Sequence, residues 1–123
     1  MPVSGASQQI RKAVLSWVGV ETVAHRFPGT ARISSPKRGG VEFLIGTREI
    51  GHIHGDWLVD IPFPTKVRDE LVSGGLAEPH HILPETGWVS FYLREEDDVQ
   101  AAIELLKRSY NIAAKQKGWK AEV

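Results

Sequence analysis

Hydrophobic residues recur at helical spacing near both ends of the chain. Near the N-terminus this spacing predicts a helix over about residues 7–18, and near the C-terminus a long helix over about residues 95–115. The first apolar stripe comprises Ile10, Val14, Leu15 and Val18. The second stripe comprises Val99, Ala102, Ile103, Leu106, Tyr110 and Ala113.

Between these helices, apolar and polar residues alternate in short runs bounded by glycine and proline, a pattern typical of β-strands. We expect strands over residues 41–45, 48–54, 57–61 and 87–93. Gly46-Thr47 and Gly55-Asp56 are turn signals between the first three of these strands. Weaker expectations are a short strand over 30–34, a short helix over 65–72 and an extended piece over 77–83.

This order of elements predicts an α+β fold. We expect an antiparallel β-sheet meander with an N-terminal helix and a long C-terminal helix packed on one face. The 123 residues suit a single domain, 1–123, which is large enough for its own hydrophobic core.

Composition excludes several classes of function. Lys+Arg and Asp+Glu are equal at 15 each, so no net positive field attracts nucleic acid or an anionic membrane. Cysteine is absent, which excludes disulfides, thiolate metal sites and a cysteine nucleophile. No apolar run reaches the ~20 residues of a membrane helix, and no signal pattern opens the chain. We therefore expect a soluble, cytoplasmic protein.

The stretch Arg48-Glu49-Ile50-Gly51-His52-Ile53-His54 carries the clearest chemical signal. On a β-strand, the i, i+2 spacing of His52 and His54 puts both imidazoles on one face. Imidazole can hydrogen-bond, titrate near neutral pH or ligate a metal. The strand is therefore expected to line a site.

Two registers are open for this strand. With two-residue turns, Ile45 pairs with Arg48 and Phe43 with Ile50; His54 then pairs with Trp57 and His52 with Val59. The histidines would share the apolar, helix-covered face with Trp57, and Asp60 would point the other way. A one-residue bulge at the second turn would instead place His52 opposite Asp60. We expect the first register, because it gathers more apolar residues.

The remaining candidates each have a functional and a structural interpretation. His52, His54 and His80 could form a metal site, a hydrogen-bonded group at the rim of the core, or a pocket that transfers protons. Adjacent residues on an extended chain face opposite ways, so at most one of His80 and His81 is expected to join the pair. Trp57, Trp88 and Tyr92 could wall a ligand or simply pack the core. Ser90 has no evident activating partner, and a surface or capping role is expected for His25.

The stretch from Arg48 to His54 resembles the catalytic domain of fungal luciferases. The later order is also similar: Gly75, then His80, then Trp88 opening a strand with Tyr92, then an acidic helix start. The chain looks like a small bacterial member of the luciferase-domain family. The resemblance covers roughly residues 41–113.

The resemblance implies an activity and a set of site residues. Fungal luciferases oxidise a hydroxylated pyrone with molecular oxygen, without a metal or organic cofactor. By this resemblance His52 or His54 would act as base and His80 would steady the developing enolate. The expected substrate-binding residues are Arg48, Glu49, Trp57, Asp60, Trp88 and Tyr92. Asp60 stands where the resemblance leads us to expect a histidine, and we expect no membrane-spanning N-terminal segment like that of the fungal enzymes.

We therefore expect a domain that binds a small aromatic or enolic molecule, as a cofactor-free oxygenase. The alternatives are a non-catalytic module for ligand binding or protein interaction, and a histidine metal site. The expected partner is a small organic molecule, with no nucleic acid and no membrane. A homodimer is left open by the sequence.

Overall fold

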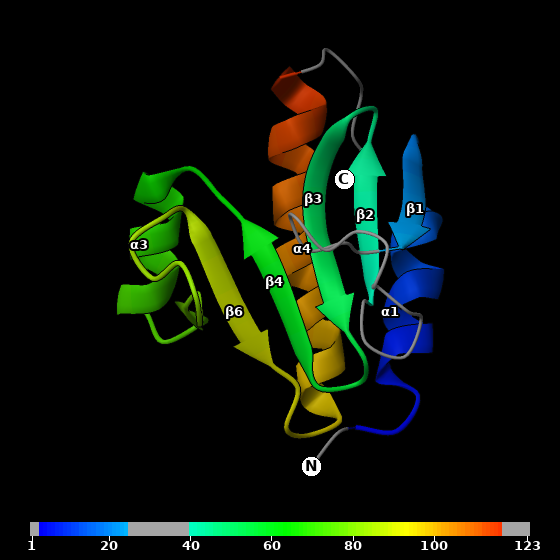
Figure 1. Ribbon diagram of the computed structural model, residues 1–123, viewed down its shortest axis with the longest axis horizontal. Helices are drawn as coiled ribbons and strands as arrows, with labels where there is room; N and C mark the ends of the chain where they lie inside the picture. Colours follow the sequence, from blue (N-terminus) through cyan, green and yellow to red (C-terminus); the bar gives the residue numbers. More distant parts are fainter. Residues whose placement is uncertain (1–2, 25–39, 117–123) are drawn as a thin grey trace.

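A six-stranded antiparallel sheet with helices packed against it forms the domain (Figure 1). The computed structural model describes residues 3–24 and 40–116. The strands are β1 (Val20–Ala24), β2 (Val41–Ile45), β3 (Arg48–His54), β4 (Leu58–Pro62), β5 (Glu78–Pro79) and β6 (Trp88–Tyr92), in the spatial order β1-β2-β3-β4-β6-β5. The helices are α1 (Ala6–Leu15), α3 (Thr65–Ser73) and α4 (Asp97–Gln116).

The predicted α+β fold is confirmed, and so are both terminal helices. The main difference is β1, which the sequence did not predict because Val18 had been counted into a longer first helix. That helix ends at Leu15, and Gly19 takes a positive φ of 85° before β1 begins. The extended piece over 77–83 forms a strand only at Glu78–Pro79. The short strand expected over 30–34 lies outside the described residues.

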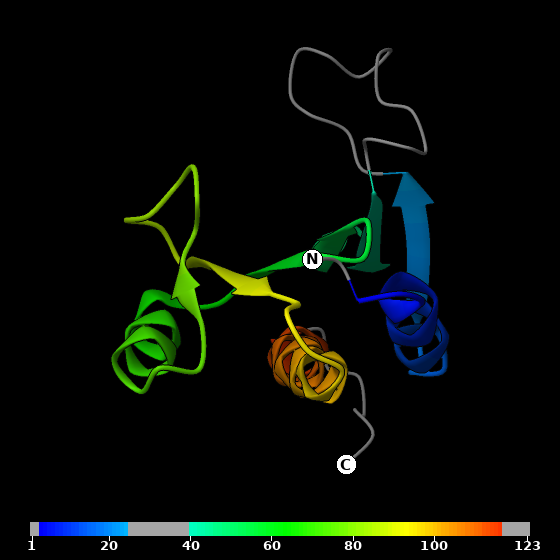
Figure 2. The same ribbon diagram turned by 90° about the horizontal axis from the view of Figure 1, so that it is seen from below.

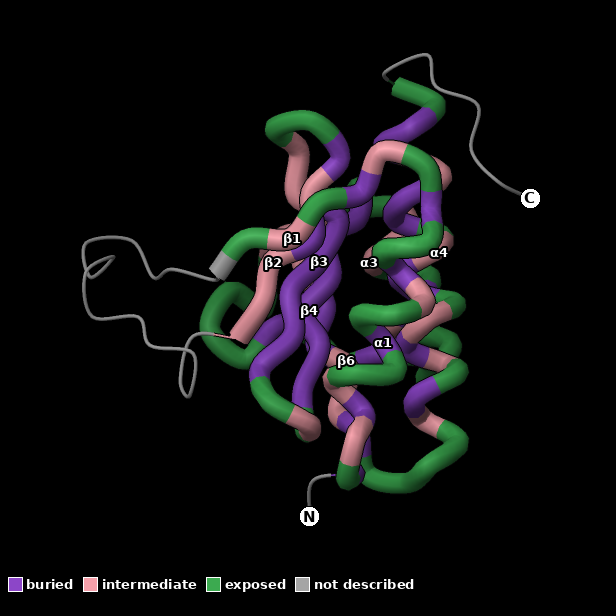
Figure 3. The backbone as a smooth tube through the Cα atoms, turned by 90° about the vertical axis from the view of Figure 1, so that its right-hand side faces the viewer, coloured by how far each residue is buried: buried purple, intermediate pink, exposed green. Residues whose placement is uncertain are grey.

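All three of these helices lie on the same side of the sheet (Figure 2). Helix α4 contacts β2, β3, β4 and α1, whereas α3 contacts β5 and β6. The hydrophobic core fills the space between the helices and the sheet, and β3 and β4 are buried along most of their length (Figure 3). Within residues 3–24 and 40–116, no helix is long and apolar enough to cross a membrane.

A bulge interrupts the pairing of β2 with β3. Ile45 pairs with Arg48 as predicted, but Phe43 pairs with Gly51 rather than with Ile50. Ile50 is the extra residue, and its side chain is fully buried in the core. A Cβ built on Gly51 would meet Leu106 of α4, so Gly51 also faces the helices. The extra residue therefore brings Glu49 and His52, three positions apart, onto the opposite face.

The register expected for the second turn is wrong. His52 pairs with Asp60, Ile53 with Val59 and His54 with Leu58, so the loop contains three residues and not two. One additional loop residue transfers every side chain of the next strand to the other face. His52, His54 and Asp60 consequently share the face opposite the helices, whereas Ile53 and Val59 belong to the core.

The same loop supplies a cap for the first helix. Gly5 is at the N-cap of α1 and has no side chain to offer, but Asp56 Oδ1 accepts the backbone N–H of Ser7 at 2.8 Å. We expect Asp56→Ala to lower the free energy of unfolding by about 0.5–2 kcal/mol, as for the loss of a helix cap. Urea denaturation measures this change. Asp56→Asn keeps an acceptor oxygen and should lose less, and equal losses in both variants would argue against the cap.

Candidate active site

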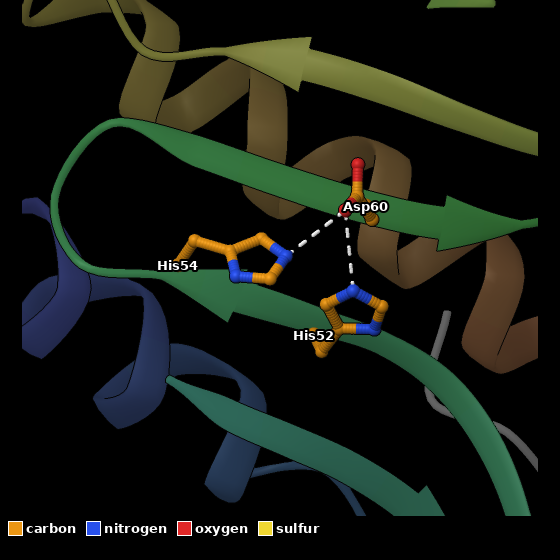
Figure 4. Close-up of side chains that lie close together, drawn as sticks. All are labelled: His52, His54 and Asp60. Atoms are coloured by element: carbon orange, nitrogen blue, oxygen red, sulfur yellow. Dashed lines mark hydrogen bonds and ion pairs between the residues drawn. The ribbon is translucent and has the colours of Figure 1, made fainter. Parts of the chain in front are cut away.

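The site is centred on the carboxylate of Asp60, which is 1% exposed. Four imidazoles bring their Nε2 atoms to its Oδ2 atom: His54 at 3.1 Å, His81 at 3.1 Å, His52 at 3.2 Å and His80 at 3.4 Å. Ser90 Oγ donates a hydrogen bond of 2.7 Å to the other oxygen, Oδ1. Figure 4 shows His52 and His54 on one strand, both pointing at Asp60 on the neighbouring strand.

Strand pairing positions most of these groups. Asp60 pairs with His52 on one side and with Ser90 of β6 on the other, so three adjacent strands present polar side chains at one level of the sheet. Two more histidines come from the segment after β5, where the chain bends at His81. The backbone N–H of His81 donates to Ser90 Oγ at 3.3 Å, which ties this segment to β6.

The four rings differ in their access to solvent. His52, His54 and His80 are 7–9% exposed as residues, whereas the side chain of His81 is 32% exposed. The ring of His81 stacks on that of His80 with a centroid distance of 4.4 Å. Of the four, His81 is therefore the ring that a molecule arriving from solvent can reach most easily.

Hydrogen bonding fixes the proton on the ring of His80. Its Nδ1 accepts the backbone N–H groups of Ile82 at 3.1 Å and Leu83 at 3.0 Å. An Nδ1 that accepts carries no proton, so the ring proton is on Nε2 and faces Asp60. Burial lowers the pKa of His80, and this effect exceeds the opposing attraction of the Asp60 charge. His80 is thus a neutral donor.

His52 lies between two carboxylates. Its Nδ1 is 2.5 Å from Oε2 of Glu49, and its Nε2 faces Asp60. Burial lowers the pKa of His52, but hydrogen bonds to Asp60 and Glu49 outweigh burial and raise the pKa to about 9. For Asp60, burial raises the pKa, but the hydrogen bonds from His52, His54 and Ser90 outweigh it and hold the pKa well below its usual value.

Aromatic rings surround the histidines on the same face. The Trp88 ring is 5.3 Å from the His52 ring and 6.0 Å from the His80 ring, between centroids. The Trp57 ring is 6.4 Å from the His54 ring, and its side chain is among the exposed large hydrophobic groups. Trp88 and Tyr92 occupy the positions of β6 that alternate onto the face of Ser90.

The Asp60 cluster comprises Glu49, His52, His54, Asp60, His80, His81 and Ser90. A cavity of about 350 Å³ is lined by Glu78, Tyr92 and Arg94 among other residues, and Ser90 is the single member of the Asp60 cluster that lines this cavity. A second cavity, of about 370 Å³, lies between α1, β1 and the start of β2, and none of the Asp60 cluster lines it. A volume of about 350 Å³ falls at the lower end of the range for small-molecule sites.

Comparison with known protein families identifies the family of this chain. The Luciferase domain family matches residues 47–109, slightly more than half of the chain. The chain belongs to the Luciferase domain family. Every residue of the Asp60 cluster falls inside the matched part of this luciferase domain, together with the bulge at Ile50 and the start of α4. No curated protein and no solved structure gives a significant match.

The structure of the luciferase domain brings together most of the residues expected from the sequence. Glu49, His52, His54, Asp60 and His80 meet in the cluster. The expected substrate-binding rings at its border are Trp57, Trp88 and Tyr92. Arg48 begins β3 next to Glu49, and strand alternation directs its side chain to the other face. His25 lies outside the described residues.

Three expectations about the cluster are wrong. Asp60 points toward the histidines and not away from them, because of the three-residue loop. Both His80 and His81 reach Asp60, because the chain bends at His81 instead of continuing extended. Ser90 has a partner, the Asp60 carboxylate. The sequence pointed to His81 only through the His80-His81 dipeptide. The assumption that this segment is extended, which would direct the two rings to opposite faces, was wrong.

Proposed function

We propose that this luciferase domain binds a small, electron-rich enolic or aromatic molecule at the Asp60 cluster and removes a proton from it, so that dioxygen can oxidise the resulting enolate. One observation carries the proposal: four imidazoles converge on one buried carboxylate, on the face of the sheet opposite the helices. Membership of the Luciferase domain family supports the choice of an oxidation.

His81 is the group best suited to take the proton. With its Nε2–H donated to Asp60, Nδ1 remains as the basic atom of a ring that solvent reaches. A carboxylate that orients a histidine in this way is a recurring arrangement for general bases. His54, also held by Asp60 but nearly buried, is the second candidate for the base.

N–H groups near His81 would stabilise the negative charge that forms on the substrate. The Nε2–H of His80 already points into the cluster, and the His80 ring stacks on that of His81. Donors that are fixed before the reaction stabilise a developing oxyanion without reorganisation. Trp88 and Trp57 offer flat apolar surfaces against which a planar substrate can pack.

Oxygen uptake tests the proposal. Purified protein is mixed under air with a hydroxylated pyrone, and oxygen consumption is followed with an electrode. We expect wild type to consume oxygen and His81→Ala to be slower by about 10²–10⁴-fold, the usual contribution of a general base. His25→Ala, which changes a histidine outside the matched residues 47–109, serves as the control and should keep the wild-type rate.

A second variant tests whether oxygen uptake needs the other rings of the Asp60 cluster as well as His81. The double variant His52→Ala/His54→Ala should also lose oxygen uptake, because it removes two of the rings around Asp60. If wild type, His81→Ala and the double variant all consume oxygen equally slowly, the catalytic proposal is wrong for this substrate class.

A binding role without catalysis is the second candidate function. Trp57, Ile82 and Leu83 are 47%, 66% and 47% exposed and belong to the loops that carry the site, which favours apolar contact with a ligand or partner. Quenching of tryptophan fluorescence by the pyrone without oxygen uptake would support this candidate over the enzyme.

A further inference from the structure

We propose that His52, His54 and Asp60 bind a divalent transition-metal ion, through the two Nε2 atoms and Oδ2. The three ligating atoms lie within 4.8 Å of one another. Two histidines and one carboxylate form a ligand set that suits Zn²⁺ and Fe²⁺. This inference goes beyond the proposed function and does not depend on it.

The two distances from Asp60 Oδ2 to the histidine nitrogens agree with the edges of a coordination polyhedron. Oδ2 of Asp60 is 3.2 Å from Nε2 of His52 and 3.1 Å from Nε2 of His54. Ligands bound tetrahedrally at about 2.0–2.1 Å from an ion are about 3.3 Å apart. A shift of a few tenths of an ångström would therefore bring these atoms to bonding distance of a common ion.

The crowding at Oδ2 is hard to explain by hydrogen bonds alone. Four ring nitrogens lie within 3.4 Å of this one oxygen. A carboxylate oxygen has about two lone-pair directions, and Ser90 already occupies the other oxygen of Asp60. An ion bound by the lone pairs of His52 and His54 would remove two of the four competing donors.

Glu49 occupies the position of an outer-sphere carboxylate. Its Oε2 is 2.5 Å from Nδ1 of His52, so this nitrogen donates to Glu49. The Nε2 atom donates to Asp60 when no ion is bound, and it would give up that proton when an ion binds beside Oδ2. Metal-binding histidines usually donate their second N–H to a carboxylate in this way, which fixes the tautomer and the ring orientation. The β3 bulge, which puts Glu49 and His52 on the same face, creates this contact.

Hydrogen bonding also excludes the competing set of ligands. Asp60, His80 and His81 form a second group with suitable spacing. However, Nδ1 of His80 accepts two backbone N–H groups, so its Nε2 holds the proton and has no lone pair for an ion. The ion is therefore placed on the side of β3, with three protein ligands.

Metal titration tests the assignment. Wild-type protein is stripped with a chelator and titrated by calorimetry with Zn²⁺, and under anaerobic conditions with Fe²⁺. We expect saturation at one ion per chain. His52→Ala and His54→Ala should weaken binding by more than about 100-fold, because even the outer partner of a ligand contributes about 10- to 100-fold.

Matched variants locate the ion. Glu49→Gln should weaken binding by about 10- to 100-fold, whereas Glu104→Gln, on the exposed side of α4, should not change it. Glu49→Gln leaves every ligand in place, so it remains informative if a histidine variant fails to fold, which circular dichroism reports. The double variant His80→Asn/His81→Ala should bind Zn²⁺ nearly as well as wild type.

Two outcomes would overturn the proposal. One is the absence of stoichiometric binding by the wild type. The other is loss of binding in His80→Asn/His81→Ala together with retention in His52→Ala and His54→Ala. Oxygen uptake is not measured in these titrations, so a negative result here leaves the proposed function standing, and failure of the pyrone experiment leaves this inference standing.

Discussion

Asp60→Ala is expected to lower the free energy of unfolding by about 3–5 kcal/mol, measured in buffer that contains a chelator. The Asp60 side chain is almost fully buried and is the common partner of four imidazoles and of Ser90 Oγ. When one member of a buried group of charges is removed, the remaining charge stays buried without a counter-charge. The stability lost in such cases is typically about 3–5 kcal/mol. The hydroxyl of Ser90, which is 0% exposed, would also lose its acceptor.

Urea denaturation followed by circular dichroism measures this loss. Asp60→Asn keeps the shape and one acceptor oxygen but removes the charge, so it should fall between wild type and Asp60→Ala. Asp69→Ala is the control, because Asp69 is exposed on α3 and pairs with Arg68 at the surface. It should change stability by no more than about 0.5 kcal/mol. A loss below about 1 kcal/mol for Asp60→Ala would show that the rings do not depend on the carboxylate.

The second large effect is expected where α4 crosses β3. Leu106 is fully buried, so Leu106→Ala should cost about 2–5 kcal/mol. A Cβ added at Gly51 would lie 2.5 Å from Leu106 Cδ2 and 3.2 Å from the backbone oxygen of Asp60. Gly51 also has a positive φ of 155°, which an alanine adopts only with strain. Gly51→Ala should therefore cost about 1–3 kcal/mol through overpacking and backbone strain.

The double variant Gly51→Ala/Leu106→Ala makes the prediction sharper. Alanine at position 106 lacks the Cδ2 atom that the new Cβ would meet, and the new methyl group fills part of the cavity. The double variant should be more stable than the sum of the single losses predicts, by about 0.5–3 kcal/mol.

A parallel cycle with Leu105→Ala is the control for this coupling. Leu105 is on the same helix, but the atoms nearest to the added Cβ belong to Leu106, Asp60 and Ile61. The loss of stability in Gly51→Ala/Leu105→Ala should equal the sum of the two single losses to within about 0.5 kcal/mol. Strict additivity in the Leu106 cycle would contradict the packing of Gly51 against that residue.

The order and type of the elements could be predicted from the sequence because these depend on local periodicity. The apolar stripe of α4 and the alternation in β2 and β4 repeat over enough residues to distinguish a helix from a strand. The i, i+2 spacing of His52 and His54 also placed both rings on one face without reference to the rest of the chain, and the structure agrees.

Which face carries the histidines was decided by the tertiary structure. A loop of two residues and a loop of three are almost equally compatible with Gly55-Asp56-Trp57, yet they place Asp60 on opposite faces of the sheet. The extra residue at Ile50 likewise determines on which face of the sheet Glu49 lies relative to His52. Both choices are decided by packing against α4, about fifty residues further along the chain, which requires Gly51, Ile53 and Val59 to face the helix.

The composition of the cluster was decided in the same way. Ser90 and His81 are separated from Asp60 by many residues and come to it only through the pairing of β4 with β6 and the bend after β5. Local spacing thus determined that two imidazoles lie side by side. Long-range strand pairing, which minimises the apolar surface left outside the core, determined that they meet a buried carboxylate and two further rings.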